Sequence, residues 1–159
     1  MPRIELVDIN QKALAMARVN AATLALSDVV FRHSDLFDEV EPGVDLIVAN
    51  PPYLVDTDQR LYRHGGGRFG AALSERIVVE GLPLLAPGGR LVLYTGSAIE
   101  DGVDAFKAAA LQRIDPSLFD IAYREIDPDV FGEELDRAAY RGVERIAAVG
   151  LVVRRRVRP

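Results

Sequence analysis

The chain has 159 residues, of which 49% are hydrophobic, so it is long enough for one domain with a substantial core and hardly long enough for two. Its net charge of −5 argues against binding nucleic acid mainly through a broad basic surface. The absence of cysteine and the presence of only two histidines exclude a thiolate zinc site and argue against a metal-dependent mechanism. Because neither a signal sequence nor a membrane-spanning apolar run is present, we expect a single cytoplasmic domain over residues 1–159.

The first third of the chain alternates short apolar runs with a stretch of helical spacing. Ile4–Val7 predicts a strand, and Asn10 is suited to cap the helix that follows it. Val29–Arg32 and Asp45–Ala49 predict two further strands. The second of these is almost wholly apolar, as expected of a strand that is buried on both faces.

The rest of the chain continues this alternation and ends in an apolar run. The expected elements are a helix at Leu73–Leu85 stopped by Pro87-Gly88-Gly89, a strand at Arg90–Tyr94, a helix at Asp101–Ile114, and strands at Ile121–Ile126 and Ile146–Arg154. We expect the last strand to pair antiparallel at the sheet edge, whereas residues 128–144 fit either a helix or an extended excursion. The pattern predicts an α/β fold with a mostly parallel sheet covered by helices on both faces.

Two acidic residues follow the first two predicted strands, and ligands collect at such strand ends in an open parallel sheet. The carboxylate of Asp8 could accept both hydroxyl protons of a ribose, or could simply favour the start of the next helix. Asp35 could accept a hydrogen bond from an adenine amino group while Leu36 and Phe37 cover the ring. A turn made by the Asp35 side chain is the alternative, and Asp35 taken alone favours it.

The third strand runs directly into the Asn-Pro-Pro-Tyr segment, residues 50–53. Two prolines fix φ and remove two N–H donors, so this segment is stiff and offers hydrogen-bond acceptors. The side-chain oxygen of Asn50 and the carbonyl of Pro51 can accept hydrogen bonds from one NH₂ group, while the ring of Tyr53 stacks on the attached π system. A plain turn is the alternative, but the position after a buried strand favours a site that orients a nitrogen.

These three strand ends, in this order, resemble class I S-adenosylmethionine-dependent methyltransferases of the small-domain type, which include release-factor glutamine and ribosomal RNA guanine methyltransferases. The resemblance implies a Rossmann-like sheet that is mostly parallel with an antiparallel last strand. It implies S-adenosylmethionine as cofactor and in-line methyl transfer to an amide or amine nitrogen. The residues so implied are, for the cofactor, Asp8, Ile9, Asp35, Leu36 and Asn50 and, for catalysis at the acceptor nitrogen, Asn50, Pro51, Pro52 and Tyr53. The acceptor implied by the resemblance is a protein glutamine or a nucleobase amino group, and the negative charge favours a protein or small molecule slightly over nucleic acid.

The chain departs from this family at its start, because the opening strand and the Gly-rich loop that should precede Asp8 are absent. In the family that strand lies between the strands that begin near Ile4 and Asp45, so its loss should leave unpaired backbone groups on both sides. We therefore expect a truncated domain that binds the cofactor weakly or not at all by itself. The alternative is a non-catalytic interaction module that completes its sheet with a partner chain or a second copy.

A second departure lies in the loop from Arg60 to Gly70, called the Arg/Gly loop below, which lacks the Glu-Pro pair typical of release-factor enzymes. Its composition predicts a mobile, cationic lid over the site, or else an ordinary flexible surface loop. We expect His64 in this loop to be solvated, and His33 to be structural.

Overall fold

In a computed structural model the chain divides into two compact units, Met1–Glu41 and Pro42–Pro159, which are described one at a time. The structure describes residues 3–56, 58, 60 and 62–157, so Leu61 of the Arg/Gly loop lies outside the described residues. No helix in the described part of the chain is long and apolar enough to cross a membrane. In the same residues, no group of three or more acidic, histidine or cysteine side chains is arranged to hold a metal ion.

The first unit is a short parallel β-α-β arrangement. Its elements are β1 (Ile4–Asp8), α1 (Gln11–Thr23) and β2 (Val29–His33), with β1 pairing directly with β2. The predicted strands and helix cap are confirmed, since the side-chain oxygen of Asn10 accepts a hydrogen bond from the backbone N–H of Lys12 at 2.9 Å. Leu14 and Ala21 form the buried side of α1.

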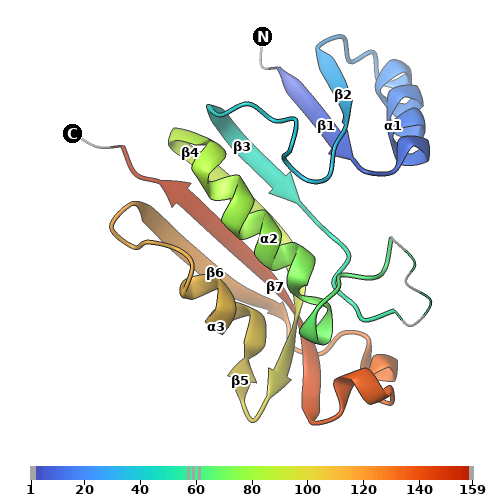
Figure 1. Cartoon of the computed structure of the whole chain (residues 1–159), viewed down its shortest axis with the longest axis vertical. Helices are drawn as coiled ribbons and strands as arrows, with labels where there is room; N and C mark the ends of the chain where they lie inside the picture. Colours follow the sequence, from blue (N-terminus) through green and yellow to red (C-terminus); the bar gives the residue numbers. More distant parts are fainter. Residues whose placement is uncertain (1–2, 57, 59, 61, 158–159) are drawn as a thin grey trace. The chain divides into compact units, whose positions relative to one another are not determined.

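The second unit is built on a larger sheet with the strand order β3-β4-β7-β6 (Figure 1). Its strands and helices are β3 (Val44–Ala49), α2 (Ala72–Gly81), β4 (Leu85–Glu100), β5 (Val103–Asp104), α3 (Ala105–Leu111), β6 (Phe119–Asp127) and β7 (Val143–Arg155). Short 3₁₀ turns lie at Arg68–Gly70, Leu82–Leu84, Gly132–Glu134 and Ala138–Tyr140. Strands β3, β4 and β6 run in one direction and β7 runs against them, while β5 forms a hairpin with β4.

The antiparallel direction of the last strand is confirmed, but its predicted place at the sheet edge is wrong. Strand β7 pairs with β4 on one side and β6 on the other, so β6 is the edge strand. The physical reason is the apolar character of both faces of β7: Ala147, Val149 and Leu151 are fully buried, and Ala148 between them is buried too. Such a strand is more stable inside the sheet than at an edge.

Helices α2 and α3 contact each other and lie on the same face of this sheet (Figure 1). Beneath them Leu91 and Leu93 of β4 pair with Val153 and Leu151 of β7, and all four are buried. Because side chains alternate along a strand, Val92, Tyr94 and Gly96 point to the opposite face, called the open face below. Within this unit no helix of the described residues covers the open face.

The outer edges of the four end strands β1, β2, β3 and β6 have no partner strand among the residues that the structure describes, and the edges of β1 and β3 are the ones at which a missing strand was predicted. Strand β1 pairs only with β2, and strand β3 pairs only with β4. This agrees with the unpaired backbone groups predicted from the missing opening strand. Each edge leaves N–H and C=O groups that could pair with a further strand.

Strand β4 and helix α3 differ from the predicted elements. Strand β4 continues to Glu100, well beyond the predicted end at Tyr94, and then turns back into β5 through Asp101 and Gly102, which have φ of 50° and 71°. Two residues with positive φ form the turn preferred in tight hairpins. Helix α3 therefore begins only at Ala105 rather than at residue 101.

Candidate active site

Within the first unit, the predicted cofactor residues lie together at the carboxyl end of the β1–β2 pair. The backbone N–H of Ser34 donates to the carbonyl of Asp8 at 3.2 Å, which joins the two strand ends. One side-chain oxygen of Asp8 accepts from the N–H of Asn10 at 2.7 Å. That bond supports the start of α1, as one of the two interpretations of Asp8 predicted, and leaves the ribose interpretation untested.

The segment after β2 makes a turn that is closed by backbone groups, so the predicted alternative of a turn made by the Asp35 side chain stays untested. The N–H of Asp38 donates to the carbonyl of Asp35 at 3.3 Å, and Leu36 has a φ of 49°. The Asp35 side chain is exposed and Leu36 is half-buried. On the β1 side, Ile9 is exposed and its carbonyl lies 2.9 Å from Nε2 of His33, which gives that histidine the structural contact expected of it.

These residues fit only part of S-adenosylmethionine. The carboxylates of Asp8 and Asp35 are suitable acceptors for ribose hydroxyls and an adenine amino group. However, the first 42 residues contain no glycine, so the first unit cannot supply a Gly-rich turn that would approach the rest of the cofactor closely. The chain therefore fits the nucleoside part of the cofactor and lacks the Gly-rich turn for the remainder.

In the second unit, Asn50 directly follows β3 and its side chain is exposed rather than turned into the core. None of the hydrogen bonds of the described residues uses its side-chain amide. Pro51, next to it, is buried and so anchors the segment. The segment thus presents an amide group that the fold itself does not use.

The ring of Tyr53 lies on the open face of the sheet. A Cβ added to Gly96 of β4 would overlap the ring and come within 2.9 Å of its Cε2 atom, so only glycine at this position leaves room for it. Tyr94 lies edge-on at 6.2 Å between ring centroids, and Phe131 lies at 6.0 Å with the planes 58° apart. Burial raises the pKa of the Tyr53 hydroxyl, and Tyr94 raises it further, so the hydroxyl keeps its proton near neutral pH.

The Arg/Gly loop supports the backbone of the Asn-Pro-Pro-Tyr segment. The N–H of Gly65 donates to the carbonyl of Leu54 at 2.9 Å, and a Cβ on Gly65 would lie 2.6 Å from the carbonyl oxygen of Pro52. A Cβ on Gly70 would lie 2.5 Å from the carbonyl oxygen of Tyr53. These glycines allow close backbone packing, a role that the prediction of a lid did not include.

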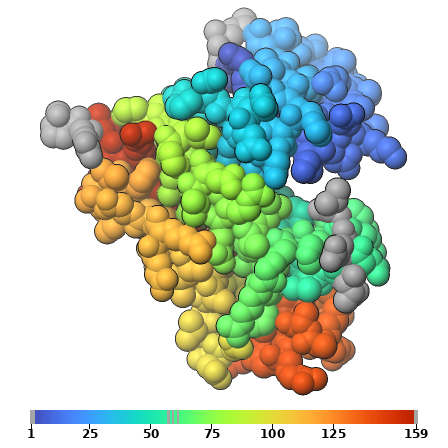
Figure 2. Space-filling model, in the orientation of Figure 1, coloured from blue at the N-terminus to red at the C-terminus, as the bar shows by residue number. Residues whose placement is uncertain are grey.

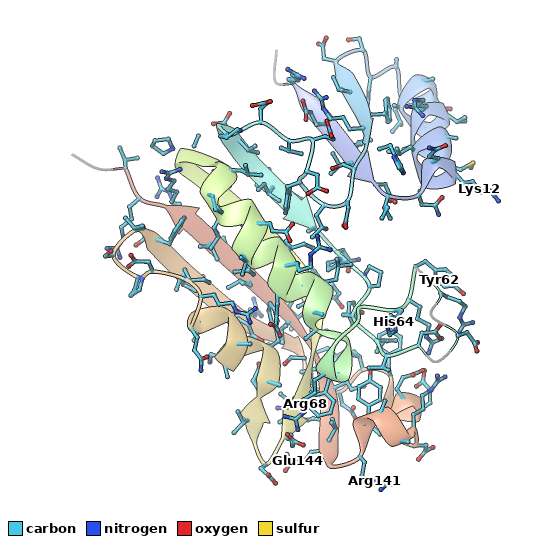
Figure 3. The ribbon with its side chains drawn as sticks, viewed as in Figure 1. Lys12, Tyr62, His64, Arg68, Arg141 and Glu144 are labelled. Carbon is cyan, nitrogen blue, oxygen red and sulfur yellow. The ribbon has the colours of Figure 1, made fainter. Side chains whose placement is uncertain are left out.

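The arginines of this loop are paired with acidic side chains, which the prediction of a cationic lid did not include. The ion pairs are Arg60 with Asp56, Arg63 with Glu134, and Arg68 with Glu100. Asp56 and Glu134 are both buried, whereas their partners Arg60 and Arg63 remain partly exposed. Figure 3 shows His64 within the loop, where its Nδ1 accepts from the N–H of Asp56 at 3.1 Å, while Tyr62 points into solvent. The half-buried, hydrogen-bonded His64 is therefore not the solvated residue predicted.

The segment between β6 and β7, residues 128–142, packs against the residues that follow Tyr53 (Figure 2). Leu54, Tyr140 and Ile146 form a small buried cluster at this contact. The N–H of Val55 donates to the hydroxyl of Tyr140 at 2.9 Å, and the ring of Phe69 stacks on Tyr140 at 6.2 Å. The β6–β7 segment, which the sequence left open between helix and excursion, is two 3₁₀ turns that wall one side of the site.

The Asp56 ion pair predicts a specific pH dependence of stability. The hydrogen bonds from Arg60 hold the pKa of Asp56 well below its ordinary value of 3.8. Because the pKa of Asp56 is lower in the folded than in the unfolded protein, its ion pair stabilises the fold fully above the unfolded-state pKa. This stabilisation is lost as pH falls from about 4 toward the folded-state pKa. In urea unfolding, Asp56→Asn should therefore lower stability most above about pH 5, and the gap to the unsubstituted protein should close in acid. A gap that stayed constant with pH would contradict this role of Asp56.

Comparisons with known proteins identify methyltransferases as similar. Residues 1–101 match the family model described as methyltransferase small domain. The release factor glutamine methyltransferase of Koribacter versatilis is 36% identical over 64% of this chain and 40% of its own length. The ribosomal protein uL3 glutamine methyltransferase of Neisseria meningitidis is 31% identical over 59% of this chain and 35% of its own length. The chain thus spans about two fifths of the length of these relatives.

Similar solved structures support the fold alone, because their sequence identities are low. TrmN from Thermus thermophilus is 22% identical, with a TM-score of 0.58 over 96% of this chain and 36% of its own. A methyltransferase from Pyrococcus furiosus is 16% identical, with a TM-score of 0.60 over 98% of this chain and 64% of its own. Because the family model matches well over half of its residues, the chain belongs to the methyltransferase small domain family.

Proposed function

We propose that this chain is part of an S-adenosylmethionine-dependent methyltransferase that methylates the side-chain amide nitrogen of a glutamine in a protein. One observation carries the proposal: an exposed Asn50 whose amide has no partner within the described residues, next to a Tyr53 ring held over Gly96. The relatives named above act, by their names, on glutamine in a release factor and in ribosomal protein uL3. The net charge of −5 also favours a protein over a bare nucleic acid.

The chemistry follows from the acceptor groups of the segment. The side-chain oxygen of Asn50 and the carbonyl of Pro51 would each accept one hydrogen of the substrate NH₂, and the ring of Tyr53 would lie against the amide plane. When bound, S-adenosylmethionine would supply the methyl group from its sulfonium and leave as the neutral thioether, and the methylated nitrogen would release one of its two protons to solvent. As the nitrogen gains positive charge its N–H bonds become better donors, so both hydrogen bonds strengthen toward the transition state. Because these hydrogen bonds are stronger in the transition state than in the ground state, they would lower the barrier to methyl transfer.

The cofactor site of this proposal is incomplete in the chain. Asp8 and Ile9 would contact the ribose, and Asp35 and Leu36 the adenine. A strand from another segment or from a partner chain, pairing with a free edge of β1 or β3, would supply what the glycine-free first unit lacks. By itself the chain should bind S-adenosylmethionine with a Kd weaker than micromolar in calorimetry. A micromolar Kd for the isolated chain would contradict that expectation.

To test the proposed function, the protein is incubated with candidate acceptors and with methyl-labelled cofactor. The cofactor is used at millimolar concentration to offset its weak binding to the chain. The acceptors are release factors, ribosomal protein uL3, ribosomal RNA and DNA. We expect label in a protein, at a glutamine located by peptide mass spectrometry. Label that enters RNA or DNA instead of a protein would refute the proposal and would favour a nucleobase amino group as the acceptor.

A further inference from the structure

We propose that Phe131 is a substrate-binding residue that forms, with Tyr53 and Tyr94, an aromatic corner for the flat amide and aliphatic stem of the acceptor glutamine. The proposal rests on the proposed function, because it adds a wall to the same site. Phe131 lies outside residues 1–101, which match the family, so that match assigns it no role.

The three rings meet edge to face rather than in a stack. Tyr94 is tilted by 66° and Phe131 by 58° against the plane of Tyr53, with centroids 6.2 and 6.0 Å away. Phe131 and Tyr94 nevertheless remain 39% and 37% exposed. An exposed aromatic surface of this kind, reached at Tyr53 three residues after Asn50 in the chain, suits a ligand that carries a planar polar group on an apolar stem.

Phe131 adopts a backbone conformation that is unfavourable for a residue with a Cβ. Its φ of 56° and ψ of 42° lie in the left-handed region, which costs free energy for any residue with a Cβ. The next residue, Gly132, could accept such a conformation without cost, and nothing lies within 4 Å of its Cβ position. Strain of this kind, retained at an exposed aromatic residue beside a site, is typical of a functional position.

Buried charges anchor the turn that carries Phe131. The N–H of Glu134 donates to the carbonyl of Phe131 at 2.8 Å, and the N–H of Val130 donates to Ile146 at 2.7 Å. The carboxylate of Glu134 is 1% exposed and pairs with Arg137 at 2.8 Å and with Arg63 of the Arg/Gly loop. A carboxylate is retained in such a place only with charged partners. It therefore fixes the turn to the same loop that supports the acceptor segment.

The first arm of the test is NMR on the whole chain, which needs no methyl transfer. The probe is acetyl-Gly-Gln-Gly-amide, titrated to millimolar concentration while the ring signals of Tyr53 and Phe131 are followed. We expect both rings to shift with the same saturation curve. A shift of Tyr53 alone would overturn the role of Phe131 and leave the proposed function standing. A shift of neither ring would overturn both.

The second arm compares variants in methyl transfer to the labelled acceptor. Phe131→Ala should raise the KM for the acceptor about tenfold and leave kcat within about twofold, because the ring contributes binding and no reacting atom. Phe131→Tyr should retain the KM of the unsubstituted protein. Val103→Ala, an exposed apolar truncation on the β4–β5 hairpin, is the matched control and should change neither constant. An unchanged KM in Phe131→Ala would overturn the proposal.

Discussion

Replacing Asn50 by alanine should lower kcat/KM for methyl transfer by at least about a hundredfold, the cost of removing one preorganised group that stabilises transition-state charge. The truncation removes the side-chain oxygen that would accept a hydrogen from the substrate nitrogen. The fold should not change, because the side chain is exposed and has no partner among the described residues. The measurement is label transfer to the acceptor, together with thermal unfolding and cofactor binding.

The matched control is Asn20→Ala, the same truncation at an exposed position of α1. It should retain full activity, because the Asn20 side chain makes no hydrogen bond in the described structure and lies on the surface of α1. Both variants should unfold within a few degrees of the unsubstituted protein, since surface truncations change stability little. Equal activity of the two variants would remove Asn50 from the site and with it the proposed function.

The residues of the acceptor segment could be predicted because their chemistry is local. A strand with a nearly continuous apolar run ends where its polarity changes, and two prolines then fix the backbone whatever surrounds it. The exposed Asn50 after β3 follows from this, but the prediction that the strand itself is buried on both faces is wrong. Leu46 and Val48 are 55% and 71% exposed, because they lie on the open face, which no helix of the described residues in this unit covers. The strands and helix of the first unit were predictable for the same reason, since the Asn10 cap and the apolar spacing of α1 act within a few residues of each other.

The walls of the site could not be predicted, because they depend on contacts between distant segments. Gly96 looks like a strand breaker in the sequence, yet β4 continues through it because Ala148 of β7 pairs with it and the ring of Tyr53 fills the space above it. Phe131 has no periodic pattern around it. Its position depends on Glu134, whose arginine partner in the Arg/Gly loop is 71 residues away in sequence.

The sequence did contain two signals that were assigned to the wrong structure. Asp101-Gly102 is a strong hairpin dipeptide that lies within the helix expected at Asp101–Ile114. The glycines of the Arg/Gly loop were interpreted as mobility, although glycine also allows two backbones to approach closely. Only the position of Gly65 against Pro52 and Leu54 distinguishes these interpretations.

Gly65→Ala should therefore destabilise the second unit by about 3 kcal/mol, a large effect for a single methyl group. The added Cβ would lie 2.6 Å from the carbonyl oxygen of Pro52 and 2.9 Å from Cα of Tyr53, and would overlap the carbonyl of Gly70. All three neighbours are backbone atoms, so no side chain can rotate to relieve the clash. Because the clash displaces Pro52 and Tyr53, methyl transfer should fall with stability. Urea unfolding and label transfer measure the two effects.

The control for this substitution is Gly132→Ala in the β6–β7 segment, where nothing lies within 4 Å of the added Cβ. Its stability should stay within about 0.5 kcal/mol of the unsubstituted protein, the usual range for a surface change. If instead the glycines of the Arg/Gly loop serve a mobile lid, Gly65→Ala would stiffen that lid. Stability would then stay the same or rise, since replacing a glycine restricts the unfolded chain. The sign of the stability change at Gly65 thus decides between a packed support for the acceptor segment and a lid.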